Sequence, residues 1–112
     1  MSARREAVLW LAQRVTAVIL AVCVLVHLAT IIYAVRGGLD AAEIMSRTRG
    51  SFAWAAFYVI FVLASAVHGA IGLRTVAAEW LRFRGEAAEW AMTVVGLVLT
   101  LMGLRAVAAV FG

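Results

Sequence analysis

The sequence predicts an all-α integral membrane protein whose three transmembrane helices form an up-down-up bundle. Of its 112 residues, 66% are hydrophobic, and the mean hydropathy is +1.04, which leaves too little charge to cover a water-soluble domain of this size. Three apolar windows each supply the roughly 20 helical residues that cross a hydrocarbon core of about 30 Å. Residues 15–35 and 51–73 contain no charged residue, and residues 90–112 contain only Arg105. The windows lack the two-residue alternation of a β-barrel.

The arginines indicate a membrane topology and argue against nucleic-acid binding. All ten basic residues are arginine, and six acidic residues leave a net charge of +4. The arginines lie between the apolar windows and form no continuous patch. Six are expected on the side of the membrane that holds the N-terminus, and four on the other side. This excess favours a cytoplasmic N-terminus, and we expect the protein in a bacterial inner membrane, in contact with lipid.

We expect one transmembrane domain over residues 1–112. The three helices are expected at about residues 10–35, 51–80 and 88–110, after a charged lead over residues 1–14. Gly37 follows Arg36 and favours the end of the first helix. Asp40 and Glu43 have the spacing of a capping box, which predicts a short interfacial helix through Met45.

His27 is the residue of the first helix that indicates chemistry. It shares one helical face with Thr16, Cys23 and Thr30. Cys23 is the only cysteine, which excludes an intrachain disulfide. An imidazole is costly to desolvate without a partner, and ionisable residues inside membranes are functional candidates. Two interpretations stay open for His27: ligation of a metal or haem, and a neutral histidine hydrogen-bonded to a neighbouring helix.

His68 makes the second helix the centre of the functional hypothesis. Small residues flank this histidine on one face, including Ser65 and Gly72. Such residues allow another helix, or a flat macrocycle, to approach the backbone. Helix packing alone would also explain the glycines, so the evidence for a binding site depends on the histidine together with its neighbours. The third helix carries Gly96 and Gly103 on one face and is expected only to pack.

The second helix resembles a known family at this point. The pattern His68-x-x-x-Gly72-Leu73-Arg74-x-x-x-x-Glu79 resembles the haem-ligand helix of the cytochrome b membrane-anchor subunits of succinate dehydrogenase and fumarate reductase. The start of the first helix, Gln13-Arg14-Val15-Thr16-Ala17, is similar to the His-Arg-Val-Ser-Gly pattern of those subunits. Together with the three helices, the resemblance covers nearly the whole chain.

The resemblance implies that His68 is an axial ligand of haem b. Neutral imidazole is a good iron ligand, and Gly69 and Gly72 would leave room for the porphyrin. Arg74 lies about 9 Å further along the helix, within reach of a haem propionate or a quinone oxygen.

His27 is expected to serve a different haem from His68. Helical rise places His27 about 18 Å from the cytoplasmic side, against about 7 to 8 Å for His68. One iron needs both ligands at a similar depth. Each histidine is therefore expected to pair with a histidine of a second copy or of a similar anchor subunit, giving one haem b or two, as in the two-haem anchors that the chain resembles.

The resemblance also implies a quinone site at the cytoplasmic edge. Arg14, beside Gln13, matches an arginine of the family's site, and Glu79 matches its acidic residue. Trp10 and Trp80 stand where the family has a serine and a tyrosine. An indole N–H donates a hydrogen bond but does not transfer a proton as a phenol does.

The expected function is that of an electron-transfer anchor. Such a subunit binds flavoprotein and iron–sulfur subunits and passes electrons through haem b to or from quinone, while the dicarboxylate chemistry of the tricarboxylic acid cycle belongs to the partners. The chain has no flavin or nucleotide motif of its own. A haem-free anchor or assembly subunit with structural histidines is the alternative. A small transporter is disfavoured because no span contains an acidic residue.

Overall fold

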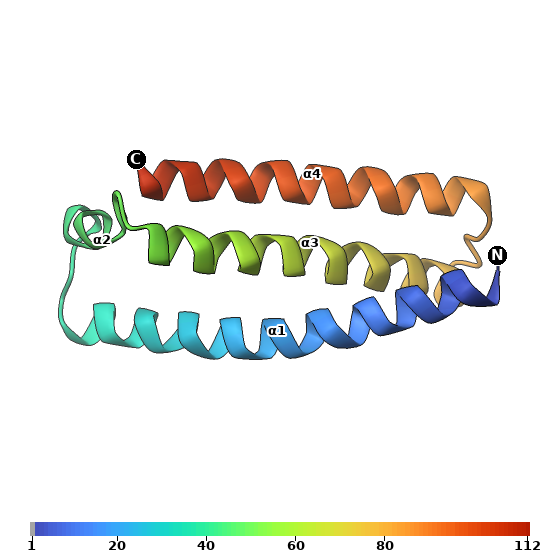
Figure 1. Ribbon diagram of the computed structural model, residues 1–112, viewed down its shortest axis with the longest axis horizontal. Helices are drawn as coiled ribbons and strands as arrows, with labels where there is room; N and C mark the ends of the chain where they lie inside the picture. Colours follow the sequence, from blue (N-terminus) through green and yellow to red (C-terminus); the bar gives the residue numbers. More distant parts are fainter. Residues whose placement is uncertain (1) are drawn as a thin grey trace.

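Four helices make up the part of the chain that the computed structural model describes, residues 2–112 (Figure 1). They are α1 (Ala3–Arg36), α2 (Ala41–Thr48), α3 (Phe52–Trp80) and α4 (Glu86–Phe111). These residues contain no strand. Helices α1, α3 and α4 are long and apolar enough to cross a membrane. The predicted fold class, all-α with three membrane-spanning helices, is therefore confirmed.

Helix α3 is the central element of the bundle. It lies between α1 and α4 and runs antiparallel to both, while α2 is seen end-on at the far end from the N-terminus (Figure 1). Both α1 and α4 pack against α3, and they scarcely touch each other. Small side chains of α3 form much of the thin core, among them Ala64, Ala66 and Ala70. The outer faces of α1 and α4 stay apolar and exposed, as faces toward lipid or another subunit do.

The helix ends show where local sequence sets the boundaries. Helix α1 begins at Ala3, so the charged lead expected over residues 1–14 is helical almost throughout. The Ser2 side chain caps it by accepting a hydrogen bond from the Arg5 backbone N–H at 3.2 Å. At the other end, Gly38 takes the left-handed conformation with φ of 64°.

The short helix α2 follows the expected cap. Asp40 Oδ1 accepts a hydrogen bond from the Glu43 backbone N–H at 2.8 Å, and the helix continues past Met45 to Thr48. The Thr48 hydroxyl then donates to the Val110 carbonyl at 2.9 Å. This bond joins α2 to the C-terminal end of α4.

A glycine of α4, Gly103, brings α4 close to α3. A methyl group placed on Gly96 would lie 3.5 Å from Ala70 Cβ, which is an ordinary contact. A methyl group placed on Gly103 would lie 2.8 Å from Val62 Cγ2 and 3.1 Å from Val62 Cβ, which is too close. Gly103 therefore permits a helix contact that no larger residue allows without movement.

Candidate functional site

His68 is the first element of the candidate site, and it contacts α1 through Thr16. The distance from Thr16 Oγ1 to His68 Nδ1 is 3.2 Å. Thr16 is buried, at 9% exposure, and His68 is half-buried. The same Oγ1 lies 2.7 Å from the Ala12 carbonyl oxygen and 3.1 Å from that of Gln13. The antiparallel packing of α1 on α3 thus joins two residues 52 positions apart.

His27 lies at a different depth from His68. Its imidazole makes edge contacts with Tyr58 and Phe61 of α3, with ring centroids 5.9 and 5.6 Å apart. Since His27 follows Thr16 by eleven residues, it lies about 16 Å further along α1 than the level of His68. Its Nδ1 is buried and has no hydrogen-bond partner. The two histidines of this chain are therefore not placed to share one iron.

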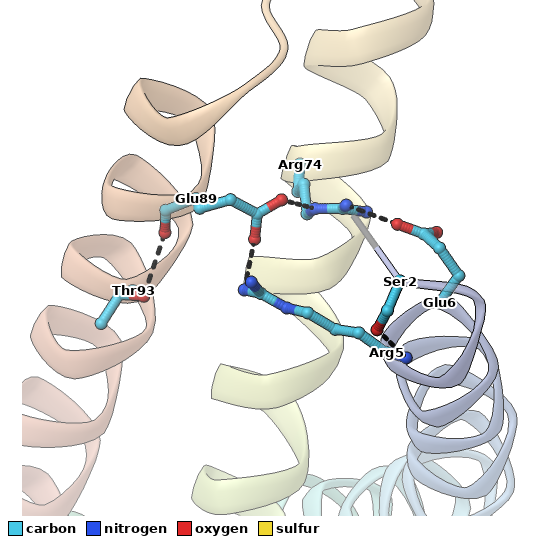
Figure 2. A network of polar contacts seen from close by, with 6 residues as sticks. All are labelled: Ser2, Arg5, Glu6, Arg74, Glu89 and Thr93. Carbon is cyan, nitrogen blue, oxygen red and sulfur yellow. Dashed lines mark hydrogen bonds and ion pairs between the residues drawn. The ribbon is translucent and has the colours of Figure 1, made fainter.

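A polar network closes the end of the bundle that holds the N-terminus (Figure 2). Arg74 on α3 donates from Nε to Glu89 on α4 at 2.8 Å and from Nη2 to Glu6 on α1 at 2.9 Å. Arg5 adds a second ion pair with Glu89 at 2.6 Å. The Arg74 and Glu89 side chains are only 16% and 17% exposed. This network joins all three membrane-spanning helices.

The network changes the interpretation of Arg74, which the sequence associated with a propionate or quinone oxygen. In the structure its guanidinium binds carboxylates of two other helices. Sequence reasoning missed Glu6 and Glu89 as its partners. The available signal was that opposite charges stand near the same membrane edge in the charged lead and in the second and third expected helices. An open cavity of about 850 Å³ adjoins the network and extends to the α3–α4 connection.

The expected quinone-site residues divide into two groups in the structure. Gln13 lies against α3, with its Nε2 3.5 Å from a methyl group placed on Gly72, and its Oε1 is buried without a partner. The Arg14 guanidinium lies over the Trp10 ring, 5.0 Å from its centroid, and both residues are exposed.

Glu79 and Trp80 form the second group, near the end of α3. Both are exposed, Trp80 at 81%. Glu79 lies about 10 Å further along α3 than Gly72. No hydrogen bond or ring contact joins either of them to the first group among residues 2–112.

The glycines around His68 face neighbouring helices. Gln13 of α1 lies beside Gly72, and a methyl group placed on Gly69 would lie 3.6 Å from Leu99 Cδ1 of α4. At both positions a methyl group would meet its neighbour at an ordinary contact distance, so packing within this chain does not require glycine there. No group of three or more His, Cys, Asp or Glu side chains in the described part of the chain is placed to hold a metal ion.

Comparison with known proteins adds one finding to this geometry. The family model of the succinate dehydrogenase/fumarate reductase transmembrane subunit matches residues 1–108. No curated protein sequence and no solved structure gives a significant match. The matched range contains His27, His68, the polar network and almost the full length of the three membrane-spanning helices. The chain therefore belongs to the family of succinate dehydrogenase/fumarate reductase transmembrane subunits.

Proposed function

We propose that the chain is the haem b-binding anchor of a succinate dehydrogenase/fumarate reductase-like complex and transfers electrons between an iron–sulfur subunit and membrane quinone. The observation that carries this proposal is the state of His68. Its Nδ1 is engaged by Thr16, whereas its Nε2 has no hydrogen-bond partner among the described residues. An imidazole held at one nitrogen and available at the other, in low-polarity surroundings, fits an axial iron ligand.

A bound haem b would supply a one-electron carrier within the membrane. His68 would hold its iron, and the second axial ligand would come from a second copy or a similar anchor subunit, because His27 lies about 16 Å away in depth. The exposed apolar faces of α1 and α4 support such an assembly. His27, with its buried and unpartnered Nδ1, is the candidate ligand for a second haem.

The end that holds the N-terminus would face the cytoplasm and bind the iron–sulfur and flavoprotein subunits, which carry out the dicarboxylate chemistry. Gln13, Arg14 and Trp10 lie near this end and are the candidates for binding quinone. A quinone carbonyl only accepts, so the Gln13 Nε2 amide would donate to it, while the buried, unpartnered Oε1 would accept from a hydroxyl of the reduced quinol. Glu79 and Trp80 would contribute from the end of α3.

A haem-free anchor is the second candidate, and the same contact between Thr16 and His68 favours it. A histidine hydrogen-bonded to a neighbouring helix needs no further reason to be retained in an apolar span. In this case the chain would attach the soluble subunits to the membrane without transferring electrons.

Haem measurements on the purified complex, which contains this chain and its associated subunits, distinguish the two candidates. The proposal expects b-type absorbance, of which the part due to the haem at His68 is lost in His68→Ala while the complex remains assembled. His27→Ala is the matched control because it removes the other imidazole of the chain, and it is expected to keep the haem at His68. An intact b-type spectrum in His68→Ala, or a wild-type complex without haem, contradicts the proposal and supports the haem-free anchor.

A further inference from the structure

We propose that Thr16 is a positioning residue that holds His68 in the Nδ1–H tautomer and so leaves Nε2 with the free lone pair. The tautomer follows from contacts within this chain. Its consequence for iron ligation depends on the function proposed above.

The direction of the hydrogen bond follows from counting protons. A threonine hydroxyl has one proton and two lone pairs, and a backbone carbonyl only accepts. Thr16 Oγ1 lies 2.7 Å from the Ala12 carbonyl oxygen, the usual length of an O–H···O bond. The hydroxyl proton is therefore directed to the α1 backbone, and Oγ1 presents a lone pair to His68 Nδ1 at 3.2 Å. For that contact to be a hydrogen bond, Nδ1 must carry the imidazole proton.

Burial makes this choice of tautomer persistent. Thr16 is 9% exposed and lies within a membrane-spanning helix, so water does not compete for its hydroxyl. The Thr16 side chain is β-branched, and its bond to the carbonyl four residues earlier restricts χ1. The acceptor is thus fixed before any ligand binds.

The tautomer decides which nitrogen of His68 can coordinate a metal. With the proton on Nδ1, Nε2 is a lone-pair donor and ligates without first losing a proton. A hydrogen bond from Nδ1–H also raises the basicity of the ligand nitrogen, which stabilises the oxidised iron. Replacing Thr16 by an apolar residue is therefore expected to raise the reduction potential of the haem.

His27 provides an internal comparison for the contact between Thr16 and His68. It is the only other histidine of the chain, and its buried Nδ1 has no hydrogen-bond partner. The contacts of Thr16 therefore apply to one imidazole and not to the other. A measurement that resolves both rings contains its own reference.

The first test uses nitrogen-15 NMR of the full chain labelled at histidine, in lipid nanodiscs without haem. The His68 ring is expected to show its proton on Nδ1, and Thr16→Val is expected to abolish this preference while the His27 signals stay in place. Thr16→Ser retains the hydroxyl and is expected to restore it. A wild-type His68 with its proton on Nε2 overturns the proposal, and this result does not depend on whether the valine variant folds.

The second test uses the purified complex. Thr16→Val is expected to raise the haem potential and shift the low-spin ferric EPR signal, and Thr16→Ser to return both toward wild type. An unchanged potential and EPR signal in Thr16→Val overturns the role of Thr16 in ligation. Absence of haem from the wild-type complex refutes the proposed function but leaves the NMR result on the tautomer standing, so the two failures are distinguishable.

Discussion

The contact between Gly103 and Val62 provides a quantitative test of how α4 packs on α3. In Gly103→Ala, the added methyl group would overlap Val62 Cγ1 and lie 2.8 Å from Val62 Cγ2. Valine is restricted to one rotamer in a helix, so its side chain does not rotate away and the helices must separate. Overpacking of this kind costs about 1–3 kcal/mol. A gain of up to about 1 kcal/mol in helix propensity offsets part of that cost.

Gly96→Ala is the matched control. It has the same change in helix propensity on the same helix, but its methyl group would meet Ala70 Cβ at an ordinary 3.5 Å. The free energy of unfolding, measured in mixed micelles with increasing denaturing detergent, is expected to be lower for Gly103→Ala than for Gly96→Ala by about 1–3 kcal/mol. Combining Gly103→Ala with Val62→Ala removes both Cγ contacts and leaves only the tight Cβ contact at 3.1 Å, so the double-mutant cycle should show favourable coupling. Equal stability of the two single variants would refute the packing described for Gly103.

Three further predictions concern charge, burial and capping. Glu89→Gln is expected to lower the free energy of unfolding in the same micelle assay by about 1–3 kcal/mol, because two guanidinium groups lose their ionised partner. Glu86 is exposed and has no ion pair in the described chain, so Glu86→Gln should change this free energy by less than about 0.5 kcal/mol. His27→Phe in the haem-free chain is expected to be neutral or stabilising by about 1–2 kcal/mol, because it removes an unpaired buried nitrogen; a clear loss of stability would contradict this. Asp40→Ala should weaken hydrogen-exchange protection in α2 by about 1 kcal/mol while leaving α4 unchanged, and equal loss in both helices would show that α2 does not open by itself.

The membrane-spanning helices could be predicted because the bilayer sets their length and their composition. The start of α1 could not be predicted, because the composition of residues 3–14 is that of a charged segment before the membrane. The Ser2 cap and the ion pairs of Arg5 and Glu6 continue the helix through this segment. The cap at Asp40 depends on residues three positions apart, and sequence alone located it.

Only part of the candidate site could be predicted from the sequence. His68 and His27 could be identified because an imidazole in an apolar span is costly wherever the helix lies. The difference in their depths also follows from helical rise, and the contact of His68 with Thr16 is consistent with it. The partners of Arg74 could not be identified, because Glu6 and Glu89 belong to helices whose rotation about their axes no single-helix pattern fixes.

The sequence by itself determined an all-α membrane protein with three spans and two intramembrane histidines, because these features depend on local hydrophobicity and on the cost of burying polar groups. Tertiary structure alone decided which side chains meet across helices: Thr16 with His68, Arg74 with two carboxylates, and Gly103 with Val62. The physical reason is that the axial shift and rotation of each helix are set by close packing against its neighbours. A change of one residue in that register would give His68 a different partner.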